Sequence, residues 1–241
     1  MKKAVTAVVL TALGLLPTWS AGASSLALPS TLDGLDAAQV TNLSFASARA
    51  QGSCTANSLG RATGYSFSAS TNAAGRVAQQ WIALDGAKGV ARLVGGTLYA
   101  HLDARMIELQ FGVNDPTDAN RWIAIPPTNK HFTTLSSGLL FSSVLSQVRP
   151  VGPLTMSGVG TLKGQKVVAI GGTANAQLGL SASAETLFVA DTAPYLPVEF
   201  TASGRVDGVP TTLLVTFSNW ARPFEYSAPV GSIAMSTTKL P

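Results

Sequence analysis

The side chains best suited to acid–base or nucleophilic chemistry are few in this sequence and stand far apart. There are two histidines, His101 at the end of an expected strand and His131 in an expected loop, and one cysteine, Cys54. A Ser-His-Asp triad could use either histidine, but no Gly-x-Ser-x-Gly, His-Glu-x-x-His or Cys-x-x-Cys segment accompanies them. We therefore expect both histidines to be surface or packing residues, and Cys54 to be a small, half-buried apolar residue rather than a nucleophile.

Metal and phosphate chemistry also lack the spacing they need. The segment Asp115 to Asp118 (Asp-Pro-Thr-Asp) resembles a metal-binding loop, but an Asx-type turn with proline in second place explains it better. The glycine pairs Gly95-Gly96 and Gly171-Gly172 lack the continuation that cradles a phosphate. Two histidines, one cysteine and scattered carboxylates give no metal-ligand spacing. The sequence predicts a protein that is not an enzyme and that needs no metal and no cofactor.

Composition narrows the class further. Charged residues make up 12% of the 241 residues, hydrophobic residues 46%, and the formal net charge is +4. A disordered chain shows the opposite balance, and a nucleic-acid binder would cluster its lysines and arginines, which are scattered here. A disulfide scaffold would need more than one cysteine. What remains is an apolar, weakly charged globular protein, expected to be a monomer that binds no nucleic acid.

The N-terminus is typical of a secretory signal peptide. Met1-Lys2-Lys3 is a short basic start, Ala4 to Leu16 is an uncharged apolar run, and Pro17 and the cleavage site Ala21-Gly22-Ala23 follow. The run is shorter than the roughly 20 apolar residues of a stable membrane anchor. The alternative, a buried N-terminal helix, requires neither the basic start nor the small-residue exit. We expect residues 1–23 to be removed and the mature protein, which has no transmembrane span, to be periplasmic, in the cell envelope or secreted.

Hydrophobic periodicity predicts a mixture of helices and strands in the first half of the mature chain. The expected elements are a helix over 35–50, strands over 65–69, 76–84 and 89–102, a helical or irregular stretch over 103–112, and an extended segment over 121–127. The strongest expected helix spans 135–148, where leucines and valines recur along one broad face.

The last third is typical of β-hairpins. Strand-like runs occupy 154–162, 166–173, 185–190, 197–203 and 210–220, separated by short gaps with no helix between them. Such spacing favours antiparallel pairing. We therefore predict an α+β fold, a large curved antiparallel sheet with two or three helices on its concave side. Residues 24–33 form a short lead, and 34–241 show no internal linker, which favours a single domain.

Several segments of the C-terminal half resemble the LppX/LprAFG-type envelope lipoproteins. The run Leu187 to Val198 (LFVADTAPYLPV) is similar to a strand-turn-strand of that family, and Phe217 to Pro223 (FSNWARP), followed by Ala228-Pro229, is similar to its closing run. Upstream, Gly95 to Tyr99 (GGTLY) and Arg121-Trp122-Ile123 stand where the family has related segments. The order and spacing of these segments carry the resemblance over most of residues 60–235.

This resemblance implies a half-barrel sheet of the LolA/LolB type whose helices enclose an apolar cavity for an acylated lipid or glycolipid, with an envelope protein as a possible partner. The family's lipobox cysteine is missing, because Cys54 lies far beyond the apolar run. The large apolar groups of the expected strands, of the stretch 103–112, of the extended segment 121–127 and of the expected long helix are the candidate lining residues. They are Trp81, Phe111, Trp122, Leu139, Leu140, Phe141, Val144 and Leu145.

Three alternatives to a lipid carrier stay open for this chain. Small residues opposite large ones can interdigitate to normal density, which would give a closed core without a ligand. An exported protein-interaction or structural module would instead show a filled interior and an exposed apolar patch. A hydrolase would require His101 or His131 beside a serine in a cleft.

The signal peptide generates the first testable prediction. The exported protein should begin at Ser24 and carry no acyl anchor, because a small-residue cleavage site precedes that position and no cysteine stands at the new N-terminus. The intact mass of the exported form should equal that of residues 24–241. A mass increased by a diacylglycerol group would contradict the prediction.

Overall fold

The computed structural model describes residues 28–113, 116–173 and 178–235, so the expected signal peptide lies outside the described residues. The α-helices are α1 (Ala37–Gln51), α2 (Ala104–Phe111), α3 (Phe132–Ser137) and α4 (Phe141–Gln147), with a 3-10 turn, η1, at Pro116–Asp118. The strands are β1 (Ser53–Ala62), β2 (Tyr65–Ala74), β3 (Val77–Leu84), β4 (Ala87–Val94), β5 (Thr97–Leu102), β6 (Trp122–Ile125), β7 (Val151–Met156), β8 (Gly160–Leu162), β9 (Gln165–Thr173), β10 (Ser181–Ala190), β11 (Pro197–Val206), β12 (Val209–Ser218) and β13 (Ile233–Ala234).

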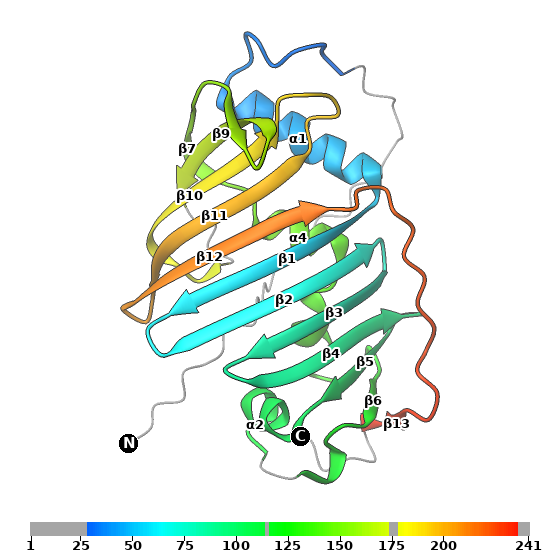
Figure 1. Cartoon of the computed structure of the whole chain (residues 1–241). Coiled ribbons are helices and arrows are strands. Elements are labelled where there is room, and N and C mark those ends of the chain that lie inside the picture. The colour runs from blue at the N-terminus through cyan, green and yellow to red at the C-terminus, as the bar shows by residue number, and fades with distance from the viewer. Residues whose placement is uncertain (1–27, 114–115, 174–177, 236–241) are drawn as a thin grey trace.

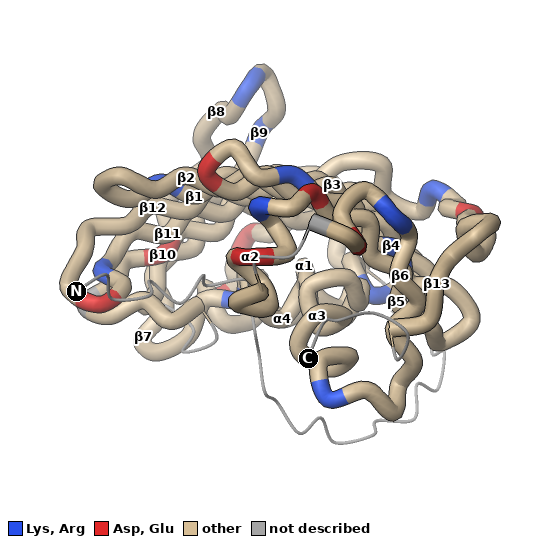
Figure 2. The backbone as a smooth tube through the Cα atoms, turned by 90° about the horizontal axis from the view of Figure 1, so that it is seen from below, with Lys and Arg blue, Asp and Glu red and all other residues tan. Residues whose placement is uncertain are grey.

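These strands form one large open sheet. Its order is β13-β6-β5-β4-β3-β2-β1-β12-β11-β10-β9-β7, with β8 paired to β9 off this path. Every pairing is antiparallel except that of β13 with β6. The sheet is strongly curved, and the helices lie on the side toward which its ends bend (Figures 1 and 2). The expected α+β class with a large, mostly antiparallel sheet is confirmed, with four α-helices in the described residues rather than two or three.

The first helix begins and ends where its local sequence directs. The Asp36 carboxylate accepts a hydrogen bond from the Gln39 backbone N–H at 2.8 Å, and the Gln39 side chain accepts one from the Asp36 N–H at 2.9 Å. This capping box satisfies two backbone donors that a helix N-terminus otherwise leaves unpaired. The helix ends at Gly52, whose φ of 72° is the left-handed conformation that glycine adopts without steric cost.

The expectation of a single long helix over 135–148 is wrong, because two short helices, α3 and α4, occupy this segment. The chain leaves α3 at Gly138, and α4 starts after Leu140, whose backbone is extended. The break allows Leu139 to be fully buried while Leu140 packs at the margin of the core.

Three strand expectations also need correction. Residues 89–102 form two strands, β4 and β5, because Gly95 and Gly96 both take positive φ values that reverse the chain. Residues 154–162 are divided between β7 and β8. Strand β1 was not expected at all, although it lies in the middle of the sheet between β2 and β12. Its sequence is too polar to show an alternating apolar pattern.

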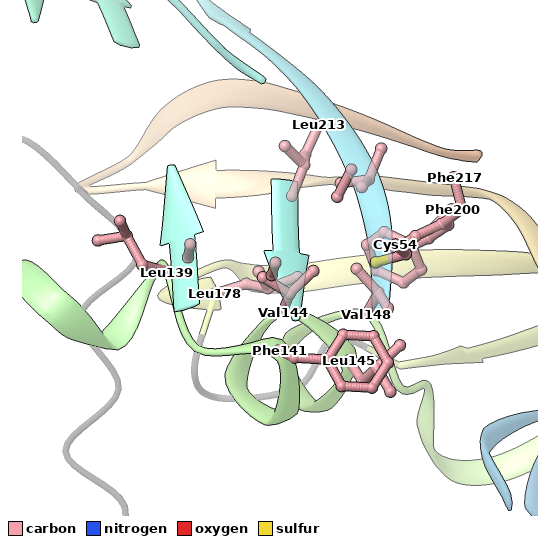
Figure 3. Close-up of a cluster of buried hydrophobic side chains, with 14 of the residues drawn as sticks. Cys54, Leu139, Phe141, Val144, Leu145, Val148, Leu178, Phe200, Leu213 and Phe217 are labelled. Carbon is pink, nitrogen blue, oxygen red and sulfur yellow. The ribbon is translucent and has the colours of Figure 1, made fainter. Parts of the chain in front are cut away.

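Strand registers divide the side chains between two faces of the sheet. The face toward the helices, called the inner face here, carries alternate residues such as Cys54, Leu84, Leu98 and Phe217, all of which are buried. The opposite, outer face carries the residues between them. Inner-face side chains meet the apolar side of α4 in a packed cluster beneath β1 and β12 (Figure 3), which contains Cys54, Phe141, Val144, Leu145, Val148, Phe200, Leu213 and Phe217.

The packing at Gly60 generates a prediction about stability. A Cβ at this β1 position would overlap the Phe67 ring on β2, so Gly60→Ala must push that ring aside. We expect the free energy of unfolding to fall by about 1–3 kcal/mol. Gly160→Ala on β8 is the matched control, because a Cβ there meets no atom within 4 Å. Urea unfolding measures both variants, and equal stabilities would contradict the expectation.

Candidate ligand-binding cavity

An apolar cavity lies between the inner face of β2–β5 and helices α2 and α3. Its volume is about 70 Å³, and it is partly open to solvent. The lining residues are Tyr65, Phe67, Ala69, Gln80, Ile82, Leu84, Ala91, Leu98, Ala100, Leu102, Met106, Gln110, Leu135 and Gly138. Helix α2 packs on β4 and β5, and α3 packs on β5, so the two helices form the side opposite the sheet.

Small side chains on the central strands leave this space unfilled. Ala91 on β4 lies directly opposite Ala100 on β5, and both are buried and face inward. Larger groups surround this alanine pair, with Met106 on the helix side and Leu98 on the strand side. Each short side chain removes volume that a leucine or valine would occupy. The void therefore follows from residue choice at alternate strand positions.

Among the described residues, the cavity lining carries few polar atoms and no charged side chain. The Gln80 amide donates a hydrogen bond to the Thr71 hydroxyl at 2.8 Å, which satisfies one of its donors inside the protein. Burial, together with the nearby Asp85 carboxylate, raises the pKa of the Tyr65 phenol, which therefore stays neutral at physiological pH. An uncharged apolar guest would meet no unpaired ion here. A charged or strongly polar group would lose its hydration without compensation.

Helix α4 and the residues just before it place four of the sequence-predicted lining residues in the packed core. Leu139, Phe141, Val144 and Leu145 are all at most 7% exposed and belong to one continuous hydrophobic cluster. Leu140 is partly buried beside that cluster. None of the five is among the residues that line the cavity. Whether they contact a bound ligand stays a prediction.

The three aromatic candidates lie elsewhere. Trp81 alternates with Gln80 and Ile82, which face the cavity, so its indole is on the outer face and 43% exposed. Trp122 is also on the outer face, where the Arg92 guanidinium lies 5.2 Å from its ring. Phe111, at the end of α2, packs edge-on against His131 at 5.5 Å between ring centroids.

Large side-chain size does not identify the residues that line this cavity, because its wall includes the small residues Ala69, Ala91 and Ala100. A signal for them was present, since Gln80, Ile82 and Leu84 alternate on one strand and Leu98, Ala100 and Leu102 on another. Strict period-two assignment puts Trp81 and Trp122 opposite these residues. The alanines mark the space better than the tryptophans do.

The residues considered for catalysis are not brought together. His101 is on the outer face against Trp122, with 5.3 Å between ring centroids, whereas His131 directly precedes α3 on the other side of the sheet. Residues 116–118 of the suspected metal loop form the turn η1, and Asp115 lies outside the described residues. Within the described ranges, no group of three metal-ligating side chains gathers in one place.

Comparisons with known proteins concern the fold. No protein-family model matches the sequence, and no curated protein matches it. Among solved structures, lipoprotein LppX of Mycobacterium tuberculosis is 16% identical over 77% of this chain and 95% of its own, with a TM-score of 0.49. LprF of Mycobacterium bovis is 14% identical over 82% of this chain and all of its own, with a TM-score of 0.46. LppX and LprF are members of the group that the sequence motifs resemble.

A further similar structure is Pseudomonas aeruginosa MucB in its complex with MucA. It is 13% identical over 77% of this chain and 59% of its own, with a TM-score of 0.35. In the described part of the chain, no helix combines the length and the apolar character needed to cross a membrane.

The buried thiol generates a prediction about reactivity. Burial raises the pKa of Cys54 from 9.0 to about 12, and the side chain is fully buried rather than half-buried. Because the thiolate is the reactive form, a disulfide reagent at pH 8 should leave the folded protein unmodified and label it in denaturant. Rapid labelling of the native protein would contradict this.

The raised pKa of Cys54 also makes the stability of the protein depend on pH. The free energy of unfolding should decline above pH 9.0, where only the unfolded chain loses the thiol proton.

Proposed function

We propose that this protein is an exported, non-enzymatic carrier that binds the alkyl chain of an acylated lipid or glycolipid in the cavity between sheet and helices. The observation that carries the proposal is the uncharged apolar lining, whose described residues include three with polar side chains, Gln80, Gln110 and Tyr65. A carrier needs a concave apolar surface with few polar groups. The resemblance of Leu187–Val198 and Phe217–Pro223 to envelope lipoproteins supports the same function.

The volume of the cavity limits what it holds in this conformation. About 70 Å³ accommodates several carbon atoms of an alkyl chain rather than a whole acyl group. Burial of about four methylene groups would contribute roughly 3 kcal/mol. A longer chain would require α3 to move away from β5, since Leu135 and Gly138 close that side. The break between α3 and α4 supplies a place where such a movement needs no helix to bend.

Ala91→Leu tests the carrier function. The added carbon atoms would enter the void that the guest is proposed to occupy, so affinity for a fluorescent fatty acid should fall about tenfold or more. The melting temperature should stay the same or rise, because filling an existing void adds contacts without strain. Probe titration and thermal melting of the mature protein measure the two effects.

Ala74→Leu is the matched control, since Ala74 lies at the end of β2 on the outer face. It should bind the probe as the wild type does. A wild-type protein that never binds the probe would contradict the carrier proposal and favour the closed-core alternative. A lower melting temperature of the Ala91→Leu variant would also contradict the carrier proposal, because overpacking a filled core costs about 1–3 kcal/mol.

A further inference from the structure

A second, larger cleft lies on the outer face of the sheet, opposite the apolar cavity. Its volume is about 650 Å³, within the range of small-molecule sites. It extends over β1 to β5 and the turn that contains Asn120. Unlike the inner cavity, it is lined by hydroxyl, amide and charged side chains as well as by apolar ones such as Val90, around one exposed indole. Its occupant must therefore satisfy both polar and apolar groups.

The strand registers align the cleft residues in a row across five neighbouring strands. Asn57 pairs with Ser70, Ser70 with Trp81, Trp81 with Val90, and Val90 with His101. Neighbouring strands lie about 4.8 Å apart, so the row from β1 to β5 spans about 19 Å. This length exceeds a single sugar ring and suits an extended, multi-unit ligand.

Trp81 is the exposed aromatic group of this row. Its indole is 43% exposed, and Ser70 across the strand and Ala83 two residues along are too small to cover the ring. The other two tryptophans of the described residues are covered, since Trp122 lies beside Arg92 and Trp220 stacks on Phe217 at 5.7 Å. A partly exposed indole in mid-sheet offers a flat apolar platform with one N–H donor.

The polar side chains beside Trp81 are available for a ligand. Within the described residues, the side chains of Asn57, Ser68 and Ser70, which line the cleft, make no hydrogen bond to the protein. The adjacent outer-face row is internally satisfied, because Thr55 donates to Asn72 at 2.8 Å and Asn72 donates to the Tyr226 hydroxyl at 3.0 Å. The contrast between the two rows marks the cleft as the unsaturated part of this face.

We propose that this cleft binds an oligosaccharide, with a pyranose ring stacked on Trp81 and its hydroxyl groups bonded to Asn57, Ser68 and Ser70. A pyranose presents a face of C–H groups and a rim of hydroxyls, which matches an indole surrounded by short donors and acceptors. A phosphate-rich ligand fits less well, since the Asp103 carboxylate, which accepts a hydrogen bond from the Lys88 backbone N–H at 2.6 Å, adds a negative charge to the lining. The cleft lies across the sheet from the alkyl cavity, so neither proposal depends on the other.

Trp81→Ala tests the sugar site in the full mature chain. Cellohexaose, maltohexaose, chitohexaose and mannohexaose are the probes, titrated by calorimetry and tryptophan fluorescence. At least one should bind the wild type, and Trp81→Ala should lower that affinity about tenfold or more, as loss of an aromatic anchor does. Trp81→Tyr, which keeps a ring, should retain most of the binding. Asn57→Ala combined with Ser70→Ala should weaken it with Trp81 intact.

Leu109→Ala is the matched control, since Leu109 is a similarly exposed apolar residue on α2. It should leave sugar binding unchanged. Uptake of the fluorescent fatty acid should be the same in Trp81→Ala as in the wild type, which separates this site from the inner cavity. Failure of the wild type to bind any of the four sugars, or binding that survives Trp81→Ala, would overturn the proposal.

Discussion

The constraint on which the structure depends is the mismatch between a long sheet and the short helices that cover it. The sheet has thirteen strands, whereas α1 has 15 residues, α2 eight, α3 six and α4 seven. Helices of this size cannot cover so wide an apolar face unless the sheet curves around them. Curvature brings the two ends toward the helices and makes α4 the centre of the packed core (Figure 3). Beneath β2–β5 the cover is thinner, and the cavity is what remains.

Alternation along the strands then gives the two faces of one sheet opposite chemistry. On β3, Ile82 and Leu84 face the cavity while Trp81 faces the outer cleft, so a single strand contributes to both. The inner site excludes polar groups because buried donors without partners are costly. The outer site keeps its polar groups because water satisfies them until a ligand replaces it. Because successive side chains of a strand point to opposite faces, a single sheet can present an apolar surface on one face and a polar one on the other.

Much of the architecture could be predicted from residue pattern, because β-hairpins and capped helices are local. The strands from β9 to β12 show short apolar runs between turn residues. The pair Asp36 and Gln39 is typical of a helix N-terminus and marks the start of α1. What failed depended on tertiary contacts. Strand β1 is polar and is held by its pairing with β2 and β12, and at the break after Gly138 the side chain of Leu139 is buried in the core. Neither fact is visible in a window of a few residues.

The location of the cavity shows why residue size misleads when sites are sought in sequences. Large side chains such as Phe141 and Val144 are the groups that fill a core, because they make the most contacts and bury the most area. A void forms where such groups are absent, as at the opposed pair Ala91 and Ala100. The informative signal is therefore a run of small residues at alternate positions of neighbouring strands, flanked by large ones. An exposed tryptophan instead indicates a binding surface, because the exposed part of the Trp81 indole buries no apolar area unless a ligand covers it.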